Sequence, residues 1–154
     1  QDVVSPIVVN PSLGLTGSET EVARMLEHDV MDWEFDVLRL SDITGGHSLQ
    51  ALGWALFERH HFRATLGIPA DAMLCFLRKA ESAYNQVAYH NSSHAACVTH
   101  GLHWLLFSSS TLAGCVSSPV EVFACLLAAV VHDVNHDGRN NAFHCACNSP
   151  LAIK

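Results

Sequence analysis

The sequence predicts an all-α fold, a compact bundle of several helices with short connections. Apolar residues recur at helical spacing in successive stretches, and no segment shows sustained alternation of apolar and polar residues. In addition, 49% of the 154 residues are hydrophobic and only 15% are charged, which is ample material for a buried core. This length suits one domain or part of one.

The first elements follow from local signals. Residues 1–18 show no helical spacing and are predicted to be a linker or tail. Ser18 and Glu21 form a capping box that should begin the first helix. Gly45-Gly46 ends the second apolar stretch, and Pro69 should begin a later helix. The first helix is expected to run to about His28, and the second apolar stretch covers residues 33–40. A helix is expected over about 47–62, with an apolar stripe of Leu49, Leu52 and Leu56. The helix that Pro69 begins has an apolar stripe at helical spacing: Met73, Phe76, Leu77, Ala80 and Tyr84.

Two later helices have clear starting signals. Asn91 or Ser92 can cap a helix, whose inward side chains should be Ala95, Val98, Leu102, Leu105 and Leu106. Ser118 and Glu121 form a second capping box around Pro119. From Val120 to Val131 only Glu121 is polar, so this helix is predicted to be buried all round.

Composition narrows the range of partners and locations. The formal net charge is −7, so nucleic acid is not an expected partner. No secretory signal is expected, and the apolar run 122–131 is too short for a transmembrane segment. The six cysteines are predicted to be reduced, packed thiols of a cytoplasmic protein.

One cluster of polar residues follows the most apolar helix, at positions 132–136. There His132 and Asp133 offer an imidazole nitrogen and a carboxylate, which suit zinc or another divalent ion. An ordinary helix C-terminus is the alternative, because His, Asn and Asp are common there.

A second cluster favours the metal interpretation. It spans residues 89–94, and its His90 and His94 are one helical turn apart. Together, the two clusters offer three or more groups that could bind a metal, which is what a catalytic metal site needs.

Two long motifs resemble the signature of the class I cyclic nucleotide phosphodiesterases. They are Tyr89-His90-Asn91-x-x-His94-Ala95 and His132-Asp133-x-Asn135-His136-x-Gly138-x-x-Asn141. Segments 33–36, 62–69 and 148–153 resemble further parts of that catalytic domain. The likeness runs from about residue 19 to the end, so it implies that residues 19–154 form the N-terminal part of a catalytic domain of the HD-type phosphodiesterase fold.

The resemblance implies a metal ligand set. His94, His132 and Asp133 match three of the four protein ligands of a tightly held metal, usually zinc. Asp133 would also bridge to a second metal, usually magnesium, for which manganese can substitute. His136 matches a histidine close to the second metal and the phosphate.

The resemblance also implies the reaction, hydrolysis of a 3′,5′-cyclic nucleotide (cyclic AMP, cyclic GMP or both) to the 5′-monophosphate. His90 matches the general acid that protonates the departing ribose oxygen. Tyr89 and Asn141 match supporting positions of the motifs. The full-length protein is compatible with a homodimer.

The family's fourth ligand, a later Asp, is expected beyond Lys154. The chain is therefore expected to stop before the catalytic domain is complete, and to be inactive by itself. Three positions depart from the family pattern: Cys97, His100 and Asp137 stand where Asp, Gln and Pro are usual. Of these, Cys97 could remove an outer partner of the metal ligands.

Two other functions stay open from the sequence. Another HD-type metal-dependent phosphohydrolase would keep His94, His132 and Asp133, but it would not need Tyr89-His90-Asn91. A catalytically inactive or truncated helical module that binds partners is the second alternative, and Cys97 and His100 favour it.

Overall fold

The computed structural model describes residues 19–109, 112, 114–116 and 118–153. These residues form helices and no strand, which confirms the all-α prediction for the described part of the chain. The first capping box lies partly outside it, because Ser18 is not described. The elements are α1 (Glu19–Glu27), the 3₁₀ helix η2 (Asp29–Met31), α2 (Val37–Ile43), α3 (Ser48–Arg59), α4 (Phe62–Leu66), α5 (Ala70–Ser82), α6 (Ser92–Phe107), α7 (Pro119–Val131) and α8 (Asn141–Ala146).

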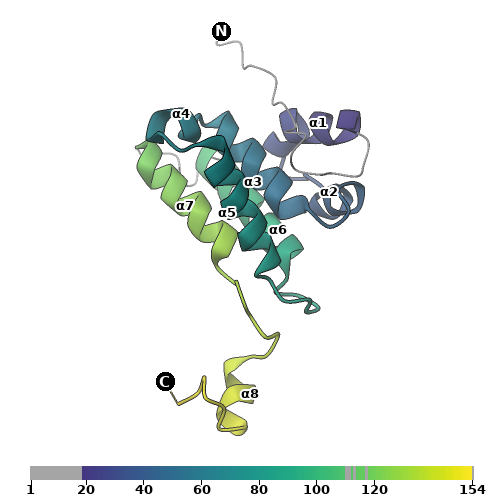
Figure 1. Cartoon of the computed structure of the whole chain (residues 1–154), viewed down its shortest axis with the longest axis vertical. Coiled ribbons are helices and arrows are strands. Elements are labelled where there is room, and N and C mark those ends of the chain that lie inside the picture. The colour runs from purple at the N-terminus through teal and green to yellow at the C-terminus, as the bar shows by residue number, and fades with distance from the viewer. Residues whose placement is uncertain (1–18, 110–111, 113, 117, 154) are drawn as a thin grey trace.

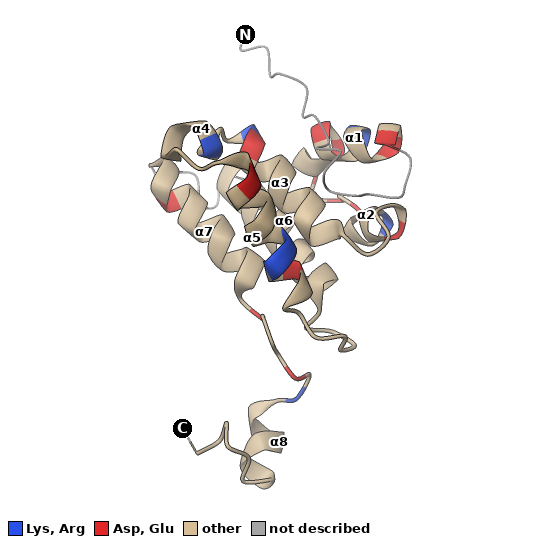
Figure 2. Cartoon of the chain, viewed as in Figure 1, with Lys and Arg blue, Asp and Glu red and all other residues tan. Residues whose placement is uncertain are grey.

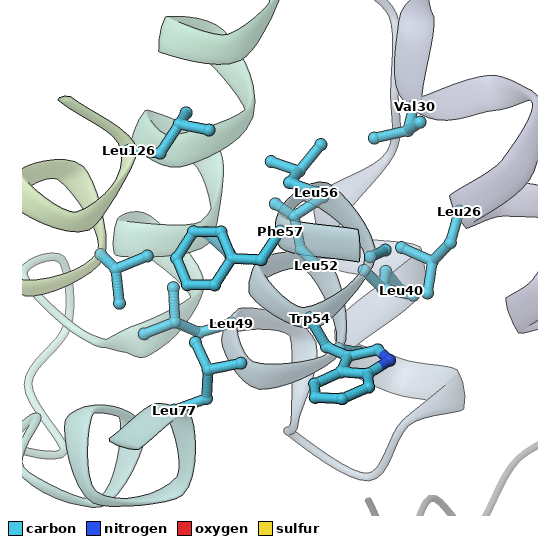
Figure 3. Packing of buried hydrophobic residues seen from close by; sticks show 14 of the residues in the cluster. Leu26, Val30, Leu40, Leu49, Leu52, Trp54, Leu56, Phe57, Leu77 and Leu126 are labelled. Carbon is cyan, nitrogen blue, oxygen red and sulfur yellow. The ribbon is translucent and has the colours of Figure 1, made fainter. Parts of the chain in front are cut away.

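Helix α3 is the centre of the bundle (Figure 1). All of its residues from 48 to 57 are buried, and both α5 and α6 pack against it. Figure 3 shows the Leu49, Leu52 and Phe57 side chains of α3 in the core that Leu77 of α5 and Leu126 of α7 complete. The predicted stripe of leucines is therefore confirmed as core.

The start of α3 is capped from another helix. Its own N-cap residue, His47, makes no side-chain capping bond. Instead Glu81 of α5 accepts hydrogen bonds from the backbone N–H groups of Leu49 at 3.1 Å and Gln50 at 3.2 Å. A carboxylate is stabilised at a helix N-terminus, so this buried acid joins α5 to α3.

The predicted helix over about 47–62 is confirmed as α3, although it ends three residues earlier than expected. Helix α3 ends at Arg59, and His61 has a left-handed backbone with φ of 54°. The chain then turns into α4, whose first residue Phe62 is buried against Phe57 and Phe123. The helix stops before residue 62 because a left-handed residue interrupts the helical backbone.

Helix α7 begins as predicted, with the capping box of Ser118 and Glu121 and with Pro119 in its first turn. The prediction that it is buried all round was wrong. Its buried residues are Val122, Leu126, Ala129 and Val130, whereas Val120 is 59% exposed and Val131 is 36% exposed. Neighbouring helices cover one face, and the other face carries apolar side chains without charge beyond Glu121 (Figure 2).

The inward face of α6 differs from the expected one. Val98 is 36% exposed, while its neighbours Thr99 and His100 are buried. His103 is also fully buried, and its Nε2 lies 3.0 Å from Nε2 of His60. His100 Nε2 lies 3.1 Å from the carbonyl oxygen of Val30. Polar partners inside the bundle therefore let histidines occupy positions that the apolar pattern assigned elsewhere.

His60 and His103 form a partly apolar pair with perturbed acidity. The His60 ring stacks on Phe62 and on Phe107, with centroids 5.4 and 4.1 Å away. Burial, followed by the nearby charge of Arg59, lowers the pKa of His60 to about 4. Burial and then His60 lower the pKa of His103 to about 3. Aromatic rings therefore cover the side chain of His60, which directly follows α3.

The cysteines are free thiols, which agrees with the predicted reduced state, but they are not packed. Five of the six are exposed, and only Cys125 is partly covered. Among the described helices, none has the length and apolar character needed to cross a membrane.

Helix α8 had not been predicted. Its N-cap Asn140 accepts a hydrogen bond from the backbone N–H of Phe143, and none of its residues is buried. Figure 1 shows α8 apart from the bundle, beyond an extended segment that follows α7.

Candidate metal centre

The first turn of α6 positions His94. The predicted cap is confirmed: Asn91 Oδ1 accepts a hydrogen bond from the backbone N–H of His94 at 3.1 Å. Asn91 Nδ2 in turn donates to the carbonyl oxygen of Val87 at 3.0 Å. These bonds fix the start of the helix, and the His94 side chain is 17% exposed.

The C-terminal end of α7 brings His132 and Asp133 to the same place. Nε2 of His94 lies 3.4 Å from Oδ2 of Asp133, and Nε2 of His132 lies 3.0 Å from the same oxygen. One potential ligand atom from each of the three residues lies within 4.8 Å of the others. The structure thus brings together the three residues that the sequence singled out, and this group could hold a metal ion.

The protonation of this trio favours a cation between its members. Nδ1 of His132 lies 2.9 Å from the carbonyl oxygen of Ala129, so it donates its proton there. In the neutral ring, Nε2 then presents a lone pair to the Asp133 carboxylate. Burial, and next the neighbouring His132, lower the pKa of His94, which keeps its nitrogen available as a ligand. Lone pairs that converge on one point repel unless a proton or metal ion lies between them, so the donor set fits a metal.

His90 and His136 lie beside this trio. Their rings stack with centroids 3.8 Å apart and an interplanar angle of 18°. The His90 ring centroid is 5.7 Å from that of His94. Nδ1 of His136 accepts a hydrogen bond from the backbone N–H of Gly138 at 2.9 Å, which leaves Nε2 to carry the proton in the neutral ring.

The two residues predicted as supporting lie in different surroundings. Tyr89 is 64% exposed, and its ring contacts those of His90 and His94 at 4.9 and 4.4 Å. Asn141 begins α8, apart from the trio (Figure 1). It lines an open cavity of about 530 Å³ together with His136, Arg139 and other residues.

Two residues of the segment that follows α5 contact the site and were not predicted to do so. The hydroxyl of Tyr84 donates to the carbonyl oxygen of Val130 at 2.9 Å and lies 3.4 Å from the backbone N–H of Asp133. Asn85 Nδ2 donates to the carbonyl oxygen of His136 at 3.0 Å. Tyr84 had been assigned only to the apolar stripe, and its buried hydroxyl was the signal that a polar partner was needed.

Comparisons with known proteins agree with the motifs. The sequence profile of the 3′,5′-cyclic nucleotide phosphodiesterase family matches residues 89–154. The 3′,5′-cyclic-AMP phosphodiesterase 4C of Mus musculus is 37% identical over 100 residues, which cover 64% of this chain and 14% of that protein. The 3′,5′-cyclic-AMP phosphodiesterase 4 of Dictyostelium discoideum is 38% identical over 82 residues, covering 53% of this chain and 8% of the relative.

A third relative is slightly less similar. The high affinity cAMP-specific and IBMX-insensitive 3′,5′-cyclic phosphodiesterase 8 of Drosophila melanogaster is 34% identical over 103 residues, covering 58% of this chain and 11% of that protein. The chain therefore spans only a small part of the length of these relatives. The matched profile nevertheless covers both histidine motifs, so residues 89–154 are similar to the 3′,5′-cyclic nucleotide phosphodiesterase family.

Proposed function

We propose that these residues form part of a site that hydrolyses a 3′,5′-cyclic nucleotide to the 5′-nucleoside monophosphate. The observation that carries the proposal is the convergence of His94, His132 and Asp133 at the meeting point of α6 and α7. Three relatives are named as cyclic AMP phosphodiesterases, which supports cyclic AMP as the first substrate to test, with cyclic GMP beside it.

We further propose that His94, His132 and Asp133 hold zinc, and that Asp133 offers a carboxylate oxygen to a second ion, magnesium or manganese. Imidazole nitrogen and carboxylate oxygen suit zinc, and carboxylate oxygen suits magnesium. Bound together, such ions supply a nucleophile near neutral pH and neutralise charge on the phosphoryl group.

The other histidines act on the substrate directly. His90 gives a proton to the departing ribose oxygen, because imidazole titrates close to neutral pH and can donate and regain a proton there. The parallel stack with His136 supports a fixed orientation of the His90 ring. His136, whose Nε2 would carry the proton, would donate a hydrogen bond to the phosphate beside the second ion. Tyr89 and Asn141 would have supporting roles.

The organisation of the whole protein follows from the same proposal. Residues 19–154 would be the N-terminal part of the catalytic domain, preceded by a tail over residues 1–18. The full-length protein would act in the cytoplasm, where free thiols such as those of this chain persist, and it could form a homodimer.

Zinc binding by the 154-residue chain tests the site. Equilibrium dialysis followed by elemental analysis should give about one zinc per chain, as expected for a single site of this kind. His132→Ala and Asp133→Ala should each abolish that binding. His28→Ala is the control, because this histidine side chain is 75% exposed and lies outside the trio. Unchanged zinc in both trio variants would refute the ligand assignment.

Catalysis is tested on the full product of the open reading frame with zinc and magnesium supplied. Cyclic AMP should be converted to 5′-AMP, and Asp133→Ala should abolish the conversion. If the full product binds zinc through the trio but leaves both cyclic nucleotides intact, a binding module or a different phosphohydrolase replaces the proposed function.

A further inference from the structure

The turn that carries two of the proposed ligands has little support of its own. We call residues 130–136, which end α7 and follow it, the ligand turn. Within it, the backbone N–H of Val134 donates to Val131 at 3.2 Å and that of His136 donates to Asp133 at 3.0 Å. Asn135 has a left-handed backbone with φ of 63°. Only Val130 is fully buried, while His132, Val134 and Asn135 are exposed.

Three consecutive residues at the end of α5 contact this turn along its length. The carbonyl oxygen of Ala83 accepts a hydrogen bond from the backbone N–H of Asn135 at 3.1 Å. The Tyr84 hydroxyl bridges the carbonyl oxygen of Val130 and the backbone N–H of Asp133. The Asn85 side chain reaches the carbonyl oxygen of His136, and its Nδ2 also lies 3.4 Å from Oδ1 of Asn135.

The Tyr84 hydroxyl makes the central contact of this set, and it links the end of α7 to Asp133. Tyr84 is 4% exposed, so its hydroxyl has no access to bulk water as an alternative partner. The carbonyl of Val130 is among the last in α7, which an α-helix leaves without a backbone partner. The same hydroxyl touches the amide of Asp133, so the end of α7 and a proposed ligand share one anchor.

We propose that Tyr84 and Asn85 are positioning residues that hold the ligand turn, and with it His132 and Asp133, in metal-binding geometry. The metal-binding part of this inference rests on the proposed function, whereas the hydrogen bonds are observed independently of it. Residues that orient metal ligands through hydrogen bonds typically change metal affinity by about 10- to 100-fold. Tyr84 acts through the backbone, so an effect of about 10-fold is expected.

Two variants of the 154-residue chain test the proposal, Tyr84→Phe and Asn85→Ala. Thr44→Val is the matched control, because Thr44 is also buried and its hydroxyl donates to a backbone carbonyl, that of Leu40, at 2.7 Å. Zinc affinity is measured by competition with a chromophoric chelator. Amide hydrogen exchange over residues 130–136 is measured in the metal-free chain.

Both positioning variants should accelerate exchange in the ligand turn and weaken zinc binding, Tyr84→Phe by about 10-fold. Thr44→Val should lower stability without either effect. Exchange and affinity that stay at the parent values in both variants would overturn the proposal. If the parent chain binds no zinc, the metal site itself has failed, and exchange in the metal-free chain alone decides whether Tyr84 and Asn85 hold the turn.

Discussion

The buried histidine pair makes the stability of the bundle depend on pH. His103 is fully buried, its Nδ1 has no hydrogen-bond partner, and its pKa is lowered to about 3. In the unfolded chain an ordinary histidine has a pKa of about 6.5. The unfolded state therefore binds the proton more readily, so the stabilisation is present above pH 6.5 and is lost as the pH falls toward 3.

The size of the loss follows from these two pKa values. At pH 5 the side chain of His103 is about 97% protonated in the unfolded chain and about 1% protonated in the folded chain. Relative to pH 8, the free energy of unfolding falls by about 2 kcal/mol from this residue alone. His60 adds a loss of the same sign, which is smaller than its pKa of about 4 suggests, because water screens its partly exposed ring.

Urea unfolding at pH 8 and at pH 5 measures this loss. Between pH 8 and pH 5, the free energy of unfolding should fall by about 2 kcal/mol more in the parent chain than in His103→Gln, whatever the absolute stability of the variant. His28→Gln should lose as much as the parent, because this histidine is exposed. Equal losses in the parent and His103→Gln would refute the lowered pKa and the neutral pair.

Three further predictions concern the site and the core. In the full product of the reading frame, His90→Ala should lower kcat by about 10²- to 10⁴-fold in a steady-state assay and leave the zinc content unchanged. Loss of zinc in this variant would show that His90 is a metal ligand. Gly138→Ala forces an alanine into a left-handed backbone with φ of 79° and places its Cβ 3.1 Å from Cγ1 of Val87. Amide hydrogen exchange at residues 136–138 should therefore become about 10-fold faster, and an unchanged rate would contradict the strain. Leu126→Ala should lower the free energy of unfolding by about 2–5 kcal/mol, because this side chain is fully buried. Val120→Ala, on the exposed face of α7, should lower it by less than about 0.5 kcal/mol. Similar urea midpoints for the two variants would contradict one-sided burial.

Features determined by neighbours in the chain could be predicted from the sequence. The caps of α6 and α7 are examples, because Asn91, Ser118 and Glu121 bond to backbone groups within three residues. The meeting of His94 with His132 and Asp133 is a long-range feature, yet it was predicted. One motif lies at the start of α6 and the other follows the end of α7, and the resemblance to a known family assigned both motifs to one metal site.

Features determined by packing could not be predicted in this way. The left-handed turn at His61 has no Gly or Pro to announce it, so the predicted helix was extended to residue 62. Helix α7 has apolar residues on every side, so no pattern of polar residues indicates which face its neighbours cover. His60 and His103 find each other across the bundle, and only that partner makes burial of the two rings tolerable.

The exposed segment between α7 and α8 has a practical consequence. Arg139 is exposed, follows the ligand turn and lies against the ring of Phe143 at 4.9 Å through a cation–π contact. Since α8 buries no residue, local opening there disturbs little of the core, and trypsin should cut after Arg139 before the bundle unfolds. That cut would release residues 140–154 and leave His94, His132 and Asp133 together on one fragment. It would also divide the cavity beside α8, because His136 and Arg139 line it from one side of the cut and Asn141 lines it from the other.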